Sequence, residues 1–445
     1  MTEKTMEQIE ELFENKDYAS LRRIMEDEEP ADVAAVLQEV PDEEALLLFR
    51  IIPKDLAAET FVEMDSDLQL SFIEKFSDRE ITEMLDEMFV DDTVDIIEEM
   101  PANVVRRILA NSSPETRSQI NQILKYPKDS AGSIMTTEFV ELRPHITVEE
   151  AFERIRVTGV DKETIYTCYV TDDSRELIGV VTVKDMILGG NEAEVGDIME
   201  TSIISADTHM DKSEVVKLLD KYDFLALPVV DAENRLVGII TFDDAMDVMR
   251  EEDTEDMEMM AAITPTEKPY LRTGVFETFL SRAPWLLILM ISAALSSFIL
   301  RYYEQGLSVV LMAYIPMLMG TGGNAGSQAS VTIIRGLSLG DIEMGDILRV
   351  IWKEMRVSVL CGAALAVVNF GKMMLFDGVG MMIAAAVSVT LVVTVIIAKT
   401  VGCSLPIIVK RIGLDPAVMA SPFITTIVDC ISLLVYVNAA GIMLS

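Results

Sequence analysis

The most constraining feature of this sequence is its long apolar second half, which begins at Ala283. Residues 283–445 contain eight acidic and nine basic side chains, whereas residues 1–282 contain the other 66 acidic and 27 basic ones. A helix that spans the hydrocarbon layer of a membrane needs about 20 predominantly apolar residues. Five segments approach or meet that length, at 283–300, 305–334, 357–376, 381–409 and 416–444. The sequence therefore predicts an α-helical transmembrane domain with five helices over residues 283–445.

The first 282 residues carry a net charge of −39, against −38 for the whole chain, but are also rich in Leu, Ile, Val and Met. An acidic disordered chain would lack these apolar residues, so folded modules are expected. A surface this negative repels a polyphosphate, which argues against a nucleic acid partner. The sequence contains no Ser/His or Cys/His arrangement, phosphate-binding loop or metal triad, so we do not expect an enzyme.

Residues 30–101 carry a proline or a helix-capping residue every eleven or twelve positions, between short helical patterns such as SDREITEMLDEMF. Helices this short are marginal alone and must stack on one another. The pattern predicts an acidic α-solenoid of short helices, which we assign to an N-terminal helical domain over residues 1–130.

Residues 131–249 contain a longer repeat, with units at about 132–190 and 191–249. In each unit we expect the order strand, helix, strand, strand, helix, and the whole resembles a tandem pair of α/β CBS domains. Both units contain a G-h-h-T-h-x-D element, formed by Gly179, Thr182 and Asp185 and by Gly238, Thr241 and Asp244. The Thr hydroxyl and the Asp carboxylate can accept hydrogen bonds from ribose hydroxyls. Alternatively, the two aspartates only cap the helices that follow.

Residues 250–282 join the two halves and begin with the acidic run REEDTEDMEMM. We expect a connector or plug helix here, with an amphipathic segment around Phe279 that lies along the membrane surface. This connector is the only covalent path from the acidic modules to the membrane domain.

A carboxylate within a membrane costs about 2.5–3.5 kcal/mol on insertion scales and by default marks a pathway. Asp429 lies well inside the last apolar segment, and Asp415 lies at the entrance of the same helix. The run 320–330, GTGGNAGSQAS, is embedded in the second segment. Its glycines either let helices approach closely or let the helix unwind, so that carbonyl groups, Asn324 and Gln328 offer oxygen to a cation. Asp429 can alternatively be a hydrogen-bonded part of the scaffold.

Oxygen ligands without a His or Cys cluster favour a hard cation such as Mg²⁺, which keeps several of its waters. One Asp per chain is a thin basis for selectivity, and a symmetric homodimer would bring two copies to its axis. Lys and Arg residues are concentrated on the same side as the acidic half. This bias predicts a multi-pass protein of the cell membrane with a cytoplasmic N-terminus and an outside C-terminus.

The order of modules, together with LMGTGGNAGSQ and GLDPAVMASPFITTIVD, resembles the MgtE family of magnesium channels. The resemblance covers nearly the whole chain. It implies a homodimeric, Mg²⁺-selective channel that moves magnesium into the cytosol and closes when Mg²⁺ binds its acidic cytosolic domains. It also implies an adenine nucleotide such as ATP in the CBS pair.

The resemblance also implies roles for individual residues. The ion path and its selectivity would involve Asp429, Thr425, Ser421, Asp415 and Asn324. The regulatory Mg²⁺ ligands would be Glu59, Asp91, Asp95, Asp211, Asp223, Asp244, Asp247, Glu255 and Asp256. A nucleotide would contact Asp185, Thr182 and Phe224.

Two residues depart from what this family leads us to expect. Relatives can carry Asn where this chain has Ser421, and Lys399 falls inside the fourth apolar segment. Two alternatives to a channel stay open, a proton-coupled secondary transporter of divalent cations and a membrane sensor of divalent ions that transports nothing.

Overall fold

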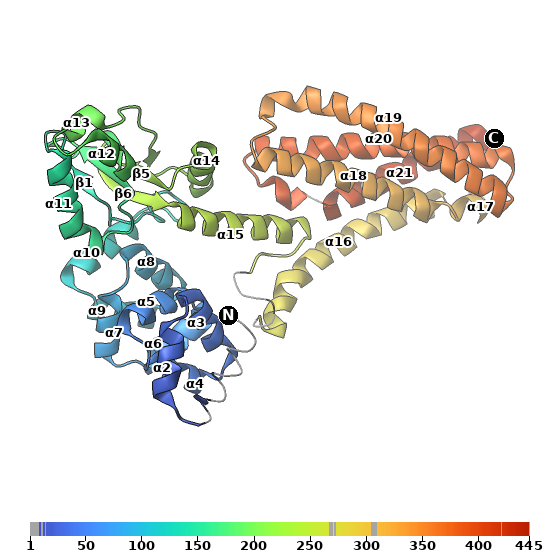
Figure 1. Ribbon diagram of the computed structural model, residues 1–445. Helices are drawn as coiled ribbons and strands as arrows, with labels where there is room; N and C mark the ends of the chain where they lie inside the picture. The colour runs from blue at the N-terminus through green and yellow to red at the C-terminus, as the bar shows by residue number, and fades with distance from the viewer. Residues whose placement is uncertain are drawn as a thin grey trace. The chain divides into compact units, whose positions relative to one another are not determined.

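A computed structural model describes residues 9, 12–13, 15–266, 270, 273–303, 309–419 and 421–444. The chain forms two compact units, Met1–Met249 and Arg250–Ser445. Figure 1 shows short helices and two small sheets in the first unit, and long helices in the second.

The N-terminal part of the first unit is a superhelix of short helices, as the spacing of prolines and caps predicts. The described helices are α2 (Tyr18–Glu26), α3 (Pro30–Glu39), α4 (Asp42–Phe49), α5 (Lys54–Val62), α6 (Ser66–Lys75), α7 (Asp78–Leu85), α8 (Val90–Glu99), α9 (Ala102–Asn111) and α10 (Pro114–Ile123). The side chains of Asp65, Ser77 and Ser113 cap α6, α7 and α10 by accepting backbone N–H groups. Each cap satisfies one of the free donors at the start of its helix. In contrast, α3, α4, α5, α8 and α9 begin without a side-chain cap.

Polar bonds join residues about thirty positions apart and fasten successive turns of the superhelix to one another. The pairs are Arg50 Nε to Glu80 Oε1 (2.8 Å), Lys54 Nζ to Glu83 Oε2 (2.9 Å) and Arg107 Nη2 to Asp78 Oδ1 (3.0 Å). Arg107 also donates to the carbonyl oxygens of Ile73 and Phe76. These bonds surround a core that includes four aromatic side chains in mutual contact, Phe49, Phe61, Phe72 and Phe76.

The rest of the first unit contains two similar α/β halves, which confirms the predicted CBS pair. The first half contains β1 (Glu141–Leu142), α11 (Val148–Thr158), β2 (Thr167–Thr171), β3 (Leu177–Thr182), α12 (Val183–Gly189) and α13 (Val195–Ile198). The second contains β4 (Ala206–Asp207), α14 (Lys212–Tyr222), β5 (Ala226–Val230), β6 (Leu236–Thr241) and α15 (Phe242–Met260). In each half the first strand is parallel to the second, and the second is antiparallel to the third.

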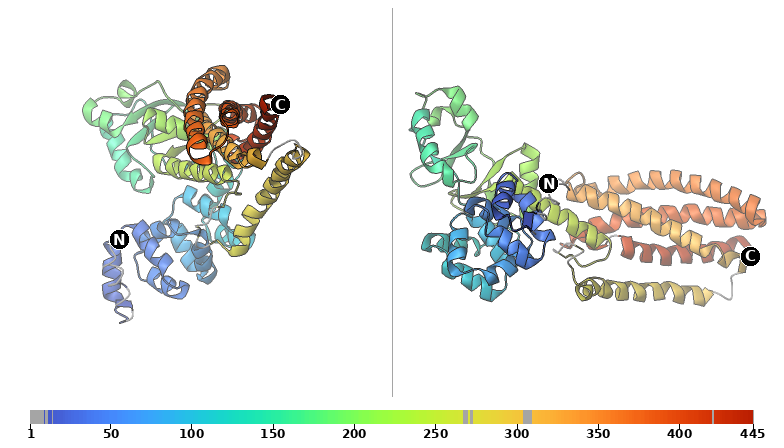
Figure 2. Two further views of the ribbon diagram at one scale, coloured as in Figure 1. Left: turned by 90° about the vertical axis from the view of Figure 1, so that its right-hand side faces the viewer. Right: turned by 60° about the horizontal axis from the view of Figure 1, so that its bottom comes forward.

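The second unit is a bundle of long helices that run alongside one another, with one short helix, α17, among them (Figure 2). They are α16 (Val275–Tyr303), α17 (Val309–Met312), α18 (Ile315–Ser338), α19 (Ile347–Lys372), α20 (Met381–Arg411) and α21 (Ser421–Leu444). A π-helical turn, Met373–Asp377, extends α19. Helix α20 contacts α18, α19 and α21, and α16 contacts α21.

Within the described residues, four segments are long and apolar enough to cross a membrane. They are Val275–Tyr303, Met344–Asp377, Met381–Arg411 and Pro422–Ala439. The glycine-rich helix α18 is not among them, although it contains 24 residues. A fifth crossing therefore stays a prediction.

The connector differs from the expected separate helix. Helix α15 begins directly after β6 and continues without a break through Arg250 to Met260. Glu277, Phe279 and Leu280 lie in the first turns of α16, which runs on for 29 residues. No glycine or proline interrupts the chain between Phe242 and Met260, so nothing ends α15 at the predicted domain boundary.

Candidate functional site

Three helices of the second unit pack closely because glycines face one another. A Cβ atom on Gly402 of α20 would clash with the backbone of Gly326 on α18. A Cβ atom on Gly326 would lie 2.9 Å from Ile424 Cγ2 and 3.2 Å from the carbonyl oxygen of Ala398. Helix α18 is continuous across residues 320–330. Of the two interpretations of these glycines, the structure supports close helix packing, because the helix does not unwind.

Asp429 lies on α21 opposite the glycine face of α18. A Cβ atom on Gly323 would lie 3.1 Å from Thr425 Cγ2 and 3.9 Å from Asp429 Oδ1. The structure therefore brings Thr425 and Asp429 against the same glycine, one helical turn apart. Within the described part of the chain, the Asp429 carboxylate forms no hydrogen bond or ion pair. It is half-buried, so its oxygens remain available to a ligand.

The other residues predicted to line the ion path are Asn324, Asp415 and Ser421. Asn324 follows Gly323 directly on α18 and is exposed. Asp415 is exposed before α21, where its Oδ1 atom accepts the N–H of Ala417 at 2.8 Å. Ser421 is the first residue of α21, and its side chain lies outside the described residues.

Two buried hydroxyl groups next to this glycine face were not predicted. A Cβ atom on Gly322 would lie 2.8 Å from Thr394 Cγ2 and 3.0 Å from Ser432 Oγ. Thr394 is fully buried, and among the described residues its hydroxyl has no hydrogen-bond partner. In contrast, Thr390 and Thr400 of the same helix donate to the carbonyl four residues earlier. The sequence does not reveal which threonine of a helix lacks the bond to the carbonyl four residues earlier, so Thr394 could not be predicted.

Lys399, which the sequence left unexplained, forms an ion pair inside the bundle. Its Nζ atom lies 3.4 Å from Glu354 Oε2 of α19, and both side chains are largely buried. The neighbouring Ala398 presents its carbonyl oxygen to α18. Lys399 is therefore directed at α19, and its charge is compensated there.

In the first unit, carboxylates from the superhelix and from both CBS halves gather in one place, the acidic cluster. Its members are Asp91, Asp92, Glu138, Glu163, Asp243 and Asp244. Asp91 and Asp92 lie in the first turn of α8, whose first N–H group donates to Glu138 Oε2 at 3.4 Å. Asp244 lies in the first turn of α15 and accepts the Thr241 hydroxyl at 2.5 Å. The start of each helix thus places acids at this junction.

Burial and mutual repulsion raise the pKa values of four of these carboxyl groups, those of Asp91, Asp92, Glu163 and Asp244. Burial, followed by the charge of Asp244, raises the pKa of Asp92 to about 7 and that of Glu163 to about 8. Burial, followed by Asp244, also raises the pKa of Asp91 well above its ordinary value. Burial, partly offset by the Thr241 hydroxyl, raises the pKa of Asp244 to about 6. The carboxyl groups of the acidic cluster therefore have little positive charge near them to compensate their own.

The donors of the acidic cluster fit a hydrated divalent cation. Asp91 is buried, and its Oδ1 atom has no hydrogen-bond partner in the described part of the chain. Over the described ranges, however, no three acidic, His or Cys side chains converge closely enough to enclose a metal ion. Mg²⁺ keeps several waters and binds through one or two carboxylates, so a water-bridged ion suits this spacing.

Of the predicted regulatory ligands, the structure brings together Asp91 and Asp244. The exposed ones are Glu59, Asp95, Asp211, Asp223, Asp247 and Glu255. Asp211 caps α14 by accepting the N–H of Ser213 at 2.9 Å, and Asp223 ends the same helix with a φ of 53°. Asp256, near the end of α15, is half-buried. Burial, followed by the charge of Asp415, raises the pKa of Asp256 to about 6.

A cavity of about 530 Å³ is lined by residues of the first CBS half and by Leu225 of the second. Its lining is mostly apolar and consists of Tyr166, Thr167, Thr182, Val183, Lys184, Ile187, Leu188 and Leu225. Thr182 lines this cavity, but its hydroxyl donates to Asp185 Oδ2 at 2.5 Å in a capping box at the start of α12. Phe224 stacks on Tyr222, with ring centroids 5.5 Å apart, and does not line the cavity. The helix-cap interpretation of Asp185 is thus what the structure displays.

Sequence reasoning missed four members of the acidic cluster. Asp92 had a signal, because it follows Asp91 in the first turn of a helix. Asp243 had the same signal, because it precedes Asp244 in the first turn of α15. Glu138 and Glu163 had none, because they are separated along the chain and only the packing of α8 on the CBS halves unites them with the others.

Comparisons with known proteins agree with this architecture. The model of the MgtE family, described as a divalent cation transporter, matches residues 315–439. The MgtE intracellular N domain matches residues 28–129, and CBS domains match residues 131–189 and 195–251. The magnesium transporter MgtE of Thermus thermophilus is 35% identical over 100% of this chain and 99% of its own. That of Bacillus subtilis is 33% identical over 94% of this chain and 93% of its own.

Solved structures match just over half of this chain. A crystal structure of the cytosolic domain of the Mg²⁺ channel MgtE in complex with ATP covers 55% of this chain and 99% of its own. Its TM-score is 0.53 at 33% identity. The soluble part of a magnesium transporter matches with a TM-score of 0.53 at 27% identity, over 56% of this chain and 98% of its own. The resemblance inferred from sequence motifs is confirmed, and the chain belongs to the MgtE family of magnesium transporters.

Proposed function

We propose that this protein is a homodimeric channel that moves Mg²⁺ into the cytosol along a path lined by Asp429. The observation that carries this proposal is the free carboxylate of Asp429, set with Thr425 against Gly323 inside an apolar bundle. A carboxylate in such a place is costly unless it serves an ion. In a symmetric dimer, two copies of Asp429 would face one hydrated Mg²⁺.

The proposed path extends from Asp429 toward the cytosol. Thr425 offers its backbone carbonyl, Ser421 and Asn324 line the wall, and Asp415 stands at the cytosolic mouth. Asp256 of the connector lies near Asp415, as their electrostatic interaction indicates. The connector over residues 250–282 therefore acts on the mouth of the path. The N-terminus is cytoplasmic, and five crossings of residues 283–445 place the C-terminus outside.

Closure of the channel follows from the acidic cluster. Without divalent cations, carboxylates of the N-terminal domain (1–130) and the CBS pair (131–249) repel one another. Mg²⁺ bridges them through its waters and favours the compact arrangement, because it binds that arrangement more tightly. Asp91 and Asp244 are the central ligands. The outlying ligands are Glu59, Asp95, Asp211, Asp223, Asp247, Glu255 and Asp256.

An adenine nucleotide such as ATP binds in the CBS pair. The supporting observation is the mostly apolar cavity lined by Thr182 and Lys184, which suits a base and a phosphate. Asp185 and Phe224 adjoin it in sequence. The solved relative that contains ATP makes this nucleotide the first to test.

The test is Mg²⁺ flux into liposomes that contain the full-length protein, at low and at high Mg²⁺ on the side of the acidic domains. We expect Asp429→Ala to abolish most of the flux, while Asp377→Ala, a matched change at another membrane carboxylate, retains it. Asp377 is paired with Lys372 at 2.9 Å and lies on the π-helical turn after α19. Wild-type flux should fall when the Mg²⁺ concentration is raised on the side of the acidic domains.

Three outcomes would contradict the proposal. Full and regulated flux in Asp429→Ala would remove Asp429 from the path. Flux that collapses with an imposed pH gradient would favour a proton-coupled transporter. A protein that binds Mg²⁺ but carries none in any condition would be a sensor.

A further inference from the structure

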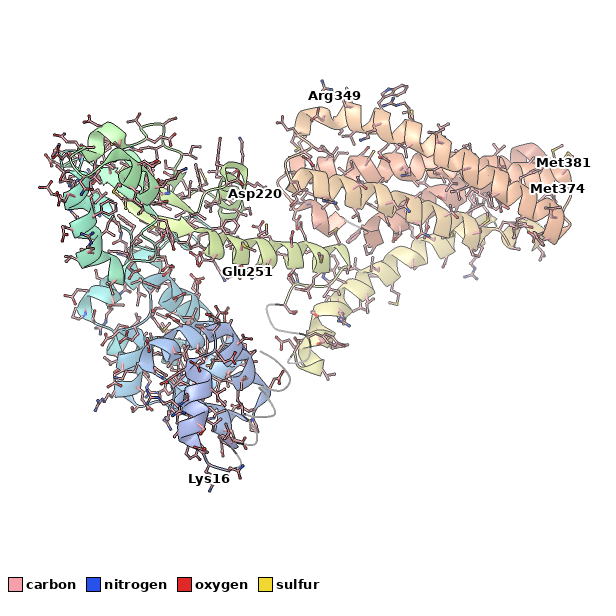
Figure 3. The ribbon with its side chains drawn as sticks, in the orientation of Figure 1. Lys16, Asp220, Glu251, Arg349, Met374 and Met381 are labelled. Carbon is pink, nitrogen blue, oxygen red and sulfur yellow. The ribbon has the colours of Figure 1, made fainter. Side chains whose placement is uncertain are left out.

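Helix α19 presents an exposed row of basic and aromatic side chains, the cationic stripe, formed by Arg349, Trp352, Lys353 and Arg356. Their spacing of three, four and seven residues places them on one face of the helix. All four are exposed. Figure 3 shows Arg349 projecting from α19 at one end of the bundle, whereas Met374 and Met381 lie at the opposite end.

The same face becomes apolar further along the helix. Leu360 and Val367 follow Arg356 by four and eleven residues, and they are 73% and 74% exposed. These residues belong to a segment long and apolar enough to span a membrane, so this apolar surface faces acyl chains. One face of α19 therefore has a polar head region and an apolar tail region, in the order found in a phospholipid.

The positive charge of the stripe is only partly compensated. Arg349 lies 3.1 Å from Asp346, and the Arg356 guanidinium lies 5.8 Å from the centre of the Trp352 ring. Neither Lys353 nor Arg356 has a carboxylate partner in the part of the chain that the structure describes. Glu354, the acid inside this segment, points inward and pairs with Lys399. Lys399 thus compensates the one acidic side chain that lies between Arg349 and Arg356 in the sequence.

The length of the stripe matches the thickness of a headgroup layer. Arg349 and Arg356 are seven residues apart, which corresponds to about 10 Å along a helix. The polar layer on each side of a bilayer is about 5–8 Å thick. Trp side chains favour this layer, and Lys and Arg residues there attract anionic lipids.

We propose that the cationic stripe of α19 binds the headgroup of an anionic phospholipid, with an acyl chain along Leu360 and Val367. Arg349, Lys353 and Arg356 contact the phosphate and any second anionic group, and Trp352 covers the glycerol region. Each basic residue contributes about fivefold to affinity. The site lies outside the ion path and is independent of the transported ion.

The experiment measures thermal unfolding of the full-length protein in neutral detergent with three additives, phosphatidylglycerol, phosphatidylcholine and inorganic phosphate. Phosphatidylglycerol should raise the unfolding midpoint by about 3 °C or more. The other two additives should have little effect. The triple variant R349Q/K353Q/R356Q should bind phosphatidylglycerol about 100-fold more weakly. The matched control K125Q/R154Q/K217Q loses the same charge from exposed positions of the first unit and should respond like the wild type.

The single variants K353Q and R356Q keep the test decisive if the triple variant does not fold, because each should weaken the lipid effect about fivefold. Native mass spectrometry of the same samples counts the retained lipids. Equal stabilisation by phosphatidylcholine would overturn the proposal, as would an unchanged response of the stripe variants. Stabilisation by inorganic phosphate alone would show a simple anion site and would also overturn it.

Discussion

At the scale of single residues, the structure explains a lysine inside an apolar helix. Removing a charge from water costs several kcal/mol unless a partner compensates it. Lys399 and Glu354 compensate each other between α20 and α19. Removal of one member of such a pair therefore destabilises the fold more than replacement of both members does.

We predict that Lys399→Met destabilises the membrane unit by about 3 kcal/mol, because it leaves Glu354 buried without a counter-charge. The double variant K399M/E354Q should recover most of that loss. Thermal unfolding midpoints of the two single variants and the double variant measure this coupling. If the losses of the single variants simply add in the double variant, the pair is not coupled.

At this scale, the sequence predicted residues whose environment follows from their own helix. Asp429 could be identified because a carboxylate within an apolar segment is already exceptional. Glu163 and Glu138 could not, because their importance depends on a helix that begins about fifty to seventy residues earlier in the chain. The partner of Lys399 was hidden for the same reason.

At the scale of elements, short-range rules worked well. Prolines and capping residues located the short helices of the superhelix, and the internal repeat located both CBS halves. The glycine run of α18 was ambiguous, since glycine allows both unwinding and close packing. The facing glycine, Gly402, is 76 positions after Gly326, and this contact decides in favour of packing.

We predict that Gly402→Ala forces α18 and α20 apart, because its Cβ atom would meet the backbone of Gly326. The expected loss is about 1–3 kcal/mol in the free energy of unfolding, with reduced flux. Gly371→Ala in α19 is the matched control, since a Cβ atom there meets nothing within 4 Å. That change should be neutral or slightly stabilising. Equal effects of the two substitutions would refute the packing role of Gly402.

At the scale of the whole molecule, the acidic cluster makes the first unit sensitive to protons as well as to cations. The pKa values of Asp92, Glu163 and Asp244 are about 7, 8 and 6, all above those of carboxyl groups in an unfolded chain. The folded unit therefore binds protons more tightly than the unfolded chain does. Stability that these groups provide at acid pH is lost as the pH rises through about 6 to 8.

We predict that, when a chelator has removed divalent cations, the first unit becomes more resistant to heat and protease as the pH falls from 8.5 to about 6. Added Mg²⁺ should replace the protons, stabilise the unit most at high pH and bind more weakly at low pH. Protease protection of the full-length protein at several pH values measures both effects. The variant D92N/E163Q should flatten the pH dependence, and a loss of protection on acidification would contradict this account.

Members of this family are transporters and not enzymes, in agreement with a sequence that contains no catalytic arrangement. The family, the order of modules and the membrane domain could be predicted because each leaves a local pattern of hydropathy or spacing. The acidic cluster as a whole could not be predicted, since it forms only when modules from different parts of the chain meet.

The polar bonds between turns of the superhelix have a consequence for how the protein is made. Each reaches about thirty residues along the chain, so the contacts that hold this domain are local in sequence. Domains with local contacts fold fast, and a ribosome adds about 5–20 residues per second. Each turn of the superhelix can therefore close within several seconds of its synthesis. We expect this domain to be folded before the first membrane helix leaves the ribosome, so that insertion begins with the acidic module already assembled.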